Sequence, residues 1–194
     1  MKVFFIRHGE AMDDVEDRYG GWYDADLSPV GRESAKKIAL EVKDKNLGVE
    51  MILTSPFKRT YQTAEIISSA LEVPLETFVY LKERNSYGLL CGVNKTEAKE
   101  KYPDLVSAFE NGQEVLGYES YDFLLKRIKI LTTKLAEMEK KVIICVTHGK
   151  LLGAIFKNIL HKETKNIPEC CLIETDLSTD GNLTLIESER VEFM

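Results

Sequence analysis

Three short runs built only of apolar residues, at 3–6, 51–53 and 142–146, restrict the folds open to this chain more than any other feature. Apolar runs of this length are typical of strands that are buried on both faces of a parallel sheet. Between them lie segments with helical spacing of apolar residues, and Ser28 followed by Pro29 is a typical helix start. Because strands and helices alternate, we expect an α/β three-layer sandwich with a mainly parallel sheet and helices on both faces.

The remaining segments extend the same alternation. Further strands are predicted at 77–81, 169–175 and 183–187, and further helices from Ser55-Pro56 to about 71, from 94 to 102, from 119 to 139 and from 149 to 161. A chain of 194 residues suits one globular domain covering 1–194. Residues 82–118 have the loosest pattern, so we expect them to form a small, helical, cap-like insertion over a site.

Composition and charge exclude several classes of function. The net charge is −6, so a nucleic-acid footprint, which needs a basic face, is not expected. Met1-Lys2 leads into an apolar run that is too short for a signal peptide, and no stretch approaches the roughly 20 apolar residues of a membrane helix. The four cysteines form no CxxC pair, which favours a reducing compartment over a disulfide scaffold. We therefore expect a cytoplasmic protein without nucleic-acid or membrane partners.

The positions of the histidines indicate where a site could form. The chain has three histidines, and two of them, His8 and His148, directly follow predicted strands. The strand at 51–53 leads into a helix that carries Arg59, and Arg7 precedes His8. In open α/β sheets, ligands bind beyond the carboxyl ends of the strands. We therefore expect the two histidines and the two arginines to meet at one mouth of the sheet.

The side chains collected at this mouth favour chemistry on a phosphate group. Two imidazole rings and two guanidinium groups make a cationic pocket with planar donors for an anion. Phosphoryl transfer depends mostly on positioning and on stabilisation of charge, which such a pocket supplies. A neutral histidine can also act as the nucleophile and form a covalent intermediate. The leaving alkoxide then needs a proton, so we expect a carboxyl group to reach the site from elsewhere in the chain.

Six motifs occur in order between residues 7 and 149. They are Arg7-His8-Gly9-Glu10; Arg18-Tyr19-Gly20-Gly21-Trp22 with Asp26-Leu27-Ser28 and Gly31; Ser55-Pro56-Phe57-Lys58-Arg59-Thr60 with Gln62-Thr63-Ala64; Leu81-Lys82-Glu83-Arg84 with Gly88; Glu119-Ser120 with Arg127; and Thr147-His148-Gly149. Together they resemble the histidine phosphatase superfamily, also called phosphoglycerate mutase-like. Because all six occur jointly, the resemblance is highly specific, whereas an Arg-His-Gly tripeptide alone would be weak.

The resemblance implies a role for each matching position. His8 would be the phosphorylated nucleophile, and Glu83 would be the proton donor that later helps to activate water. Arg7, Arg59 and His148 would bind the phosphoryl group, with His148 among the catalytic residues. Further contacts to the substrate phosphate are expected from Asp14, Gly20 and Lys95. The resemblance implies no metal and no other cofactor, and the partner would be a small phosphorylated metabolite.

Departures from the mutase pattern favour hydrolysis. Asp14 stands where the family usually has a phosphate-binding Asn, Gly20 replaces a Ser expected in mutases, and Lys150 replaces an Asn. Residues 103–118 contain no Arg or Lys, whereas mutases resemble one another in carrying a basic pair there. A mutase must hold its intermediate in a closed, basic site and return the phosphoryl group to its product. We therefore expect a metal-independent phosphatase that hydrolyses a small phosphomonoester, with phosphoglycerate mutase-type transfer as the alternative.

Asp14 carries a hypothesis of its own. A carboxylate beside a phosphate would repel it unless Arg18 or Lys95 neutralises the charge. Alternatively, Asp14 points away or contacts a positive group of the substrate. If it faces the phosphate, Asp14→Asn should tighten the binding of inorganic phosphate.

The sequence leaves several further interpretations open. Lys95 could be a solvated helix start, and Glu97 or Glu100 could be mistaken for Glu83 as the acid. The two strand-end histidines could instead hold a metal ion, which would need carboxylate ligands from other strand ends. A non-catalytic phosphate-binding relative and an enzyme acting on a phosphorylated protein are two more options. The apolar closing strands near the C-terminus could form the interface of a homodimer.

Overall fold

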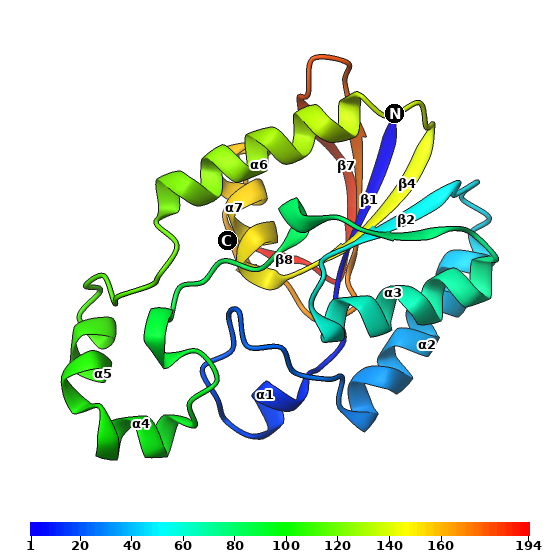
Figure 1. Ribbon diagram of the computed structural model, residues 1–194. Coiled ribbons are helices and arrows are strands. Elements are labelled where there is room, and N and C mark those ends of the chain that lie inside the picture. The colour runs from blue at the N-terminus through cyan, green and yellow to red at the C-terminus, as the bar shows by residue number, and fades with distance from the viewer.

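A six-stranded sheet forms the centre of the computed structural model, which describes residues 1–194 (Figure 1). Its strands are β1 (Lys2–Arg7), β2 (Met51–Thr54), β3 (Leu75–Thr77), β4 (Val142–Thr147), β6 (Leu172–Leu177) and β7 (Leu183–Glu189). They stand in the order β3-β2-β4-β1-β6-β7. The pairs β3–β2, β2–β4 and β4–β1 are parallel, whereas β1–β6 and β6–β7 are antiparallel. The expected α/β fold with a mainly parallel sheet is confirmed.

Helices fill most of the chain between the strands. They are α1 (Met12–Val15), α2 (Pro29–Asp44), α3 (Lys58–Leu71), α4 (Lys95–Lys101), α5 (Pro103–Glu110), α6 (Tyr121–Ala136) and α7 (Gly149–Asn158), with the 3-10 turns η1 (Val79–Leu81) and η2 (Gly88–Leu90). Side-chain oxygens of Ser28, Asn94 and Ser120 accept hydrogen bonds from backbone N–H groups in the first turns of α2, α4 and α6. These caps satisfy donors that have no partner within the helix.

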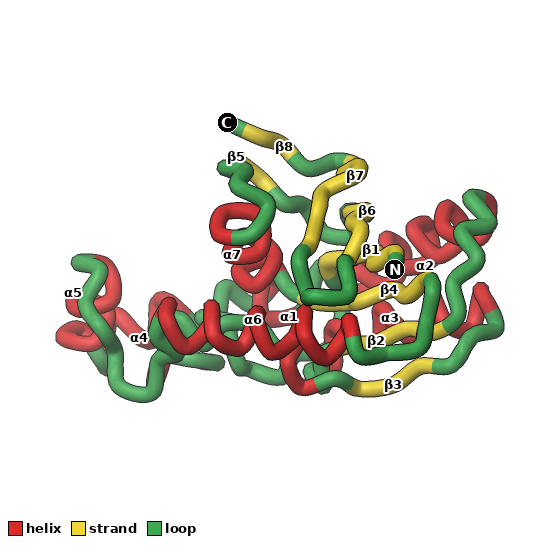
Figure 2. Tube along the Cα trace, turned by 90° about the horizontal axis from the view of Figure 1, so that it is seen from above, coloured by secondary structure: helices red, strands yellow, loops and turns green.

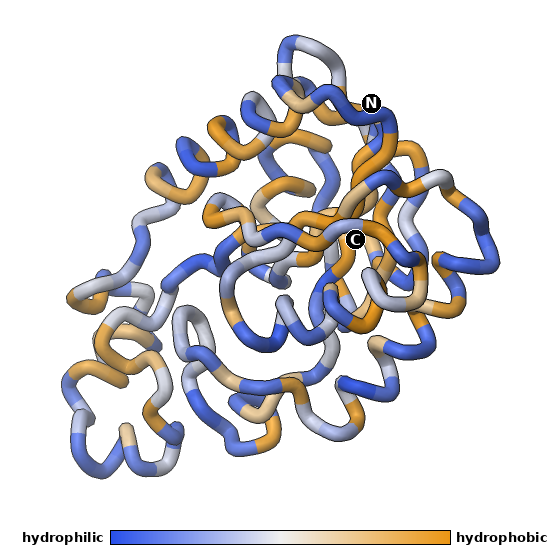
Figure 3. The backbone as a smooth tube through the Cα atoms, turned by 45° about the vertical axis from the view of Figure 1, so that its right-hand side comes forward, coloured by the Kyte–Doolittle hydropathy of each residue, from blue (hydrophilic) through white to orange (hydrophobic).

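The two faces of the sheet are covered by different helices. Successive side chains of a strand point to opposite faces, so Phe4 and Ile6 of β1 pack with α2 and α3, whereas Val3 and Phe5 pack with α6 and α7. Figure 1 shows α2 and α3 side by side on one side of the strands and α6 along the other. In Figure 3 the hydrophobic colour follows the central strands. The three layers of the predicted sandwich are therefore present.

The strand predicted at 77–81 is wrong. β3 ends at Thr77, and the chain then forms the turn η1. The carbonyl groups that a strand would use are taken by side chains, because Arg127 donates to the carbonyls of Tyr80 and Lys82, and Thr147 donates to the carbonyl of Leu81. Interactions distant in sequence thus override a local pattern that favours a strand.

Several boundaries also differ from the sequence-based expectations. α3 begins at Lys58, not at the Ser55-Pro56 pair, and α6 covers Tyr121–Ala136, a shorter span than 119–139. Three short elements were not expected: α1 and the antiparallel pair formed by β5 (Thr164–Asn166) and β8 (Glu192–Phe193). Such short segments carry too few residues for a periodic pattern to emerge.

Residues 82–118 stand apart from the sheet. They contain η2, α4 and α5. Leu90, Ala98 and Val106 of this segment form a small apolar cluster with Tyr19, separate from the two clusters on the faces of the sheet. Figures 1 and 2 both place α4 and α5 at the end of the molecule farthest from β2 and β3. No helix of the protein is long and apolar enough to cross a membrane.

Candidate active site

A cavity of about 430 Å³ opens beside His8, which directly follows the carboxyl end of β1. Eighteen residues line it, and two of them are hydrophobic. The lining includes Arg7, Arg59 and Glu83, which come from separate parts of the chain. The strand order places β1 next to β4, so the loops that follow these two strands meet at one edge of the sheet. A polar cavity at this edge suits a small charged ligand.

His8 is buried and held as a neutral ring. Its Nδ1 lies 2.7 Å from the carbonyl oxygen of Gly9, and its Nε2 lies 3.3 Å from Nε of Arg59. A carbonyl can only accept and a guanidinium can only donate, so Nδ1 carries the proton and Nε2 carries the lone pair. Burial, and then the positive charges of Arg59 and Arg7, hold the pKa of His8 well below its usual range. The ring is therefore ready to act as a nucleophile through Nε2.

Arg59 lies in the first turn of α3 and has an exposed fraction of only 2%. Its two terminal nitrogens donate to the carbonyl oxygens of Tyr23 and Gly21, at 2.6 and 2.8 Å. These bonds join α3 to the loop that carries the second motif. Each terminal nitrogen bears two N–H groups, so one donor on each is left for a ligand.

Arg7 is held by the segment that contains residues 167 and 169. It forms an ion pair of 2.5 Å with Glu169 and donates to the carbonyl of Ile167 at 2.6 Å. Its buried Nε has no partner. Because the other two nitrogens are anchored, the guanidinium can present this free N–H to an anion without losing its position.

His148 packs directly against His8. The two ring centroids are 5.0 Å apart in an edge-to-face arrangement, and Nε2 of His148 lies 2.9 Å from Oγ of Ser55. Burial, and then the charge of Arg59, hold the pKa of His148 well below its usual range. Its Nδ1 has no partner. The ring does not contribute to the lining of the cavity, in contrast to His8.

Glu83, the residue expected to be the acid, lines the cavity, and its carboxyl group lies at the N-terminus of α7. Its Oε1 accepts the N–H groups of Arg84 and Leu151 at 2.8 and 3.1 Å, and its Oε2 accepts the N–H of Lys150 at 3.1 Å. Oε2 accepts only one of these bonds and so has a free position at which a proton can be carried. By contrast, Glu97 pairs with Lys101 at 2.7 Å and does not line the cavity.

The loop that carries Glu83 is held by Arg127 and Trp22. Arg127 donates to the carbonyls of Tyr80, Lys82 and Glu83, and it forms a two-bond ion pair with Glu119, of 2.8 and 2.9 Å. The indole nitrogen of Trp22 donates to the carbonyl of Glu83 at 2.7 Å. Residues from two other sequence motifs thus position the loop that carries Glu83.

Three buried side-chain atoms in the whole protein lack a hydrogen-bond partner, and all belong to this region. They are Nε of Arg7, Nδ1 of His148 and Oδ1 of Asp13. Native proteins leave few such atoms, and each one calls for an explanation. The Arg7 atom is a donor, the His148 atom becomes one when it carries the ring proton, and the Asp13 atom is an acceptor. An oxyanion could satisfy the first two atoms, since it brings only acceptors.

The other residues predicted to contact phosphate lie at the rim of the cavity. Asp14, Gly20 and Lys95 all line it. Lys95 also forms an ion pair of 2.5 Å with Asp17, and Arg18 forms one of 2.5 Å with Glu16. Neither Arg18 nor Lys95 forms an ion pair with Asp14, because both pair with other carboxylates.

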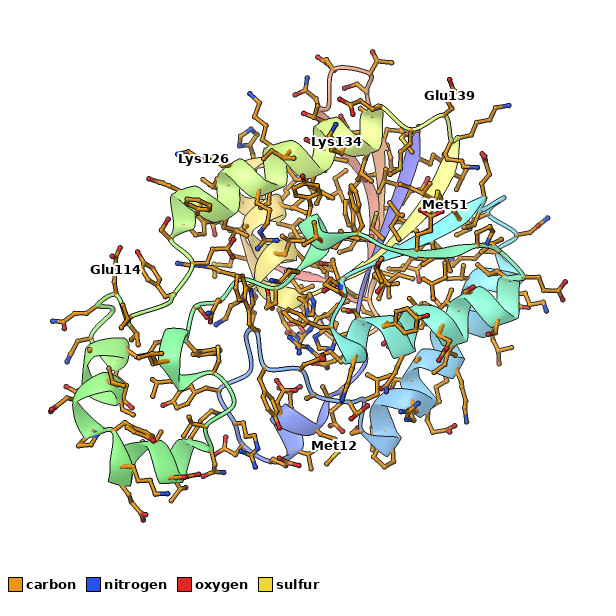
Figure 4. All side chains as sticks on the ribbon, viewed as in Figure 1. Met12, Met51, Glu114, Lys126, Lys134 and Glu139 are labelled. Atoms are coloured by element: carbon orange, nitrogen blue, oxygen red, sulfur yellow. The ribbon has the colours of Figure 1, made fainter.

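Two sets of lining residues were missed by sequence reasoning. Asp13 is buried, with an exposed fraction of 5%, whereas its neighbour Asp14 is exposed. Figure 4 labels Met12, the residue before Asp13, on α1. From the sequence, Asp14 and not Asp13 was singled out, because nothing in the pattern shows which of the two adjacent acids faces inward. Residues 164–167 also line the cavity, and no motif marks them.

The donor set does not favour a metal ion held by the two histidines. No group of three His, Cys, Asp or Glu side chains lies close enough together to hold a metal ion. The cavity places Arg7, Arg59 and Lys150 around His8 instead, and these cations would repel a bound metal.

Comparisons with known proteins agree with this geometry. The sequence model of the histidine phosphatase superfamily (branch 1) matches residues 3–184. The structure is similar to a mycobacterial glucosyl-3-phosphoglycerate phosphatase, with a TM-score of 0.76 and 18% identity over 96% of this chain and 97% of that chain. It is also similar to the α-ribazole phosphatase of Shigella flexneri (TM-score 0.81, 20% identity, 96% and 95% covered) and to a phosphoglycerate mutase of Bacillus anthracis (0.79, 19%, 96% and 92%). At these identities the three likenesses establish the fold.

Proposed function

Because this chain belongs to the histidine phosphatase superfamily (branch 1), we propose that it is a phosphomonoesterase that forms a covalent phosphohistidine on His8. The observation that carries the proposal is the lone pair on Nε2 of His8, which the hydrogen bond from Nδ1 to Gly9 fixes on the side of Arg59. The substrate would be a small phosphorylated metabolite. A volume of about 430 Å³ and a largely polar lining support this size and charge.

The first half of the reaction forms the intermediate. Nε2 of His8 attacks phosphorus, the bond from phosphorus to the ester oxygen breaks, and the leaving alkoxide takes a proton from Oε2 of Glu83. The free N–H of Arg7 and the spare N–H groups of Arg59 stabilise the equatorial oxygens. His148 does not line the cavity, and its ring, which packs against His8, would hold the nucleophile in place.

The second half returns the enzyme to its starting state. A water molecule attacks phosphorus, the carboxylate of Glu83 takes its proton, and the bond between phosphorus and Nε2 breaks. Inorganic phosphate leaves, and His8 is again a neutral ring. No external oxidant, reductant or metal is needed to balance either half.

Transfer within a sugar-acid phosphate, as in a mutase, is the second candidate. Lys150 and Lys165 line the cavity, and they would let it hold a second anionic group. Against this, Asp13 and Asp14 place two carboxyl groups at the same cavity. Residues 103–118, where mutases carry a basic pair, do not line it. Hydrolysis is therefore the function that we favour.

We also propose a role for residues 82–118 and a location for the protein. The segment would act as a cap on a single domain, since Glu83, Tyr87 and Lys95 line the cavity while α4 and α5 pack in a cluster of their own. A cytoplasmic location is supported by four cysteines that form no disulfide.

The test is hydrolysis of a generic aryl phosphate in the presence of a chelator. We expect the parent protein to be active, and His8→Ala to be inactive with an unchanged fold. His161→Ala is the matched control, because His161 is exposed and does not line the cavity. Activity that is lost to the chelator would overturn the metal-free mechanism, and activity retained in His8→Ala would overturn the nucleophile.

A separate assay distinguishes the mutase. Conversion between phosphoglycerate isomers, measured alongside release of inorganic phosphate, reports both reactions on one substrate. Isomer conversion that exceeds phosphate release would favour the second candidate over the first. Mass spectrometry of the quenched protein should find the phosphoryl group on the peptide that contains His8.

A further inference from the structure

Asp13 places an unsatisfied acceptor in the cavity. Its side chain is 5% exposed, its Oδ1 has no hydrogen-bond partner, and it takes part in none of the ion pairs of the protein. Burial raises the pKa of this carboxyl group, which the nearby charge of Arg59 partly opposes. A buried carboxylate without donors is costly, so its retention beside His8 needs a reason.

Gly20 is the position that makes room for this carboxyl group. A Cβ atom on residue 20 would lie 2.3 Å from Oδ2 of Asp13. Any residue larger than glycine would therefore push the carboxyl group out of its place. Gly20 has no left-handed backbone conformation that would otherwise require glycine. The carboxyl group of Asp13 thus fills the space that a side chain at position 20 would occupy.

The protein itself offers no donor to this acceptor. Nε of Arg59 donates to His8, and its terminal nitrogens donate to Gly21 and Tyr23. Arg18 and Lys95, the other cations on this side, pair with carboxylates on the rim. No group of the protein donates to Oδ1 in this arrangement, and the spare N–H groups of Arg59 are those assigned above to the phosphoryl group. A ligand can therefore supply the donor that Oδ1 lacks.

A phosphoryl group does not supply that donor. As a dianion it brings only acceptor oxygens, which suit the free N–H of Arg7 but would repel Asp13. The group that satisfies Asp13 must belong to the alcohol part of the substrate. A hydroxyl or an ammonium group near the ester would donate to Oδ1, whereas a carboxylate there would be repelled.

We propose that Asp13 is a specificity-determining residue, which selects phosphomonoesters that carry a hydrogen-bond donor, hydroxyl or ammonium, close to the ester and rejects those that carry a carboxylate there. The inference rests on the proposed function, because it places the phosphoryl group at His8. It narrows the substrate class to polyol, sugar or amino-alcohol phosphates. It also accounts for Gly20 in a position where a side chain would displace the selecting group.

The test compares ligands of similar size that differ in one group. The probes are propyl phosphate, 2-hydroxyethyl phosphate, 2-aminoethyl phosphate and phosphoglycolate. Dissociation constants are measured by calorimetry in the His8→Ala background, so that no turnover is needed. The kcat/KM values are measured in the parent background. For each variant, the kcat/KM and the association constant of a donor-bearing probe are divided by the same quantity for propyl phosphate. This ratio cancels any general effect on phosphate binding.

Asp13→Ala should lower this ratio about ten- to a hundredfold, the range expected for a hydrogen bond to a charged group. Gly20→Ala should lower it in the same direction, because its Cβ displaces the carboxyl group. In both variants the kcat/KM and the affinity for phosphoglycolate should rise relative to those for propyl phosphate. Asp104→Asn is the matched control, since Asp104 is exposed on α5 and lies outside the cavity.

Asp13→Asn separates the two kinds of donor. An amide oxygen can still accept from a hydroxyl but no longer attracts a cation, so a selective loss for 2-aminoethyl phosphate assigns an ammonium group. An unchanged ratio in Asp13→Ala would overturn the proposal, as would an equal change for all four probes, which would place Asp13 on the phosphoryl group. Absence of aryl phosphate hydrolysis in the parent would instead overturn the proposed function, and the binding ratios would still decide the role of Asp13.

Discussion

Nε of Arg59 donates a hydrogen bond to Nε2 of His8 across 3.3 Å, so the ring nitrogen beside the cavity carries a lone pair. The same arginine places a positive charge next to the ring, which together with burial keeps the pKa of His8 low. Arg59 therefore has two effects on the nucleophile before any substrate binds. It fixes the tautomer, and it keeps the ring neutral in mildly acidic solution.

The first prediction concerns the titration of His8. We expect its ring to stay neutral as the pH falls through about 6.5, where an ordinary histidine gains a proton. In Arg59→Gln the positive neighbour is gone, so the pKa of His8 should rise toward the ordinary value while burial still holds it below that value. Nitrogen chemical shifts of the imidazole rings report both proteins directly. A His8 ring that titrates near 6.5 in the parent would contradict the prediction.

The second prediction is a loss of stability in mild acid. The pKa values of His8 and His148 are lowered in the folded protein, whereas in the unfolded chain both should titrate near 6.5. Below that pH the unfolded state binds protons that the folded state does not, so the free energy of unfolding should fall as the pH falls. The slope should grow as the pH falls through about 6.5 and approach about 1.4 kcal/mol per pH unit for each histidine near pH 5.5. Urea denaturation between pH about 7.5 and about 5.5 measures it, and His148→Gln should roughly halve it.

The sequence predicts the layers of this fold well because burial on both faces leaves a plain signal. The runs at 3–6, 51–53 and 142–146 became β1, β2 and β4, which stand next to one another in the sheet. The strand predicted at 77–81 does not form as expected, because Arg127 and Thr147 donate hydrogen bonds to the carbonyl groups of Tyr80 and Leu81. A side chain that is distant in sequence leaves no trace in the local pattern.

The sequence indicated the region of the site, while the roles of its residues stay predictions. His8, Arg7 and Arg59 line one cavity, as the strand ends suggested, whereas His148 does not line it. The sequence could not show which of two adjacent acids points inward, because α1 is a single turn whose orientation is set by its contacts. Asp13 therefore emerged only from the packing around Gly20.

The third prediction separates the acid from the nucleophile. Glu83→Gln cannot give a proton to the leaving group, so hydrolysis of an alkyl phosphate should slow by about a hundred- to ten-thousandfold. An aryl phosphate whose phenolate leaves readily needs no proton, so the rate of the first step should fall much less for this substrate. The rate of the initial burst for the two substrates gives the comparison. Equal losses for both would contradict a role for Glu83 in protonating the leaving group.

The fourth prediction concerns Arg127 as a positioning residue. Arg127→Met removes three hydrogen bonds to the loop of Glu83 and leaves the carboxylate of Glu119, whose side chain is 9% exposed, without its partner. Breaking such a pair costs about 3–5 kcal/mol of the free energy of unfolding. The double variant Arg127→Met/Glu119→Leu should recover much of that stability without recovering kcat, because the loop stays unanchored. Recovery of both would show that Arg127 acts on stability alone.

The fifth prediction tests the close approach that holds the nucleophile loop. A Cβ on Gly31, at the start of α2, would lie 2.0 Å from the backbone oxygen of Glu10, two residues beyond His8. Backbone cannot rotate away as a side chain can, so Gly31→Ala should cost about 1–3 kcal/mol and lower kcat by displacing the loop. Gly153→Ala is the matched control, because its Cβ would meet only Ile167, at 4.0 Å. In a helix that change should stabilise the protein by up to about 1 kcal/mol. Urea denaturation of both variants measures these changes in the free energy of unfolding. Equal midpoints would show that the loop tolerates the displacement.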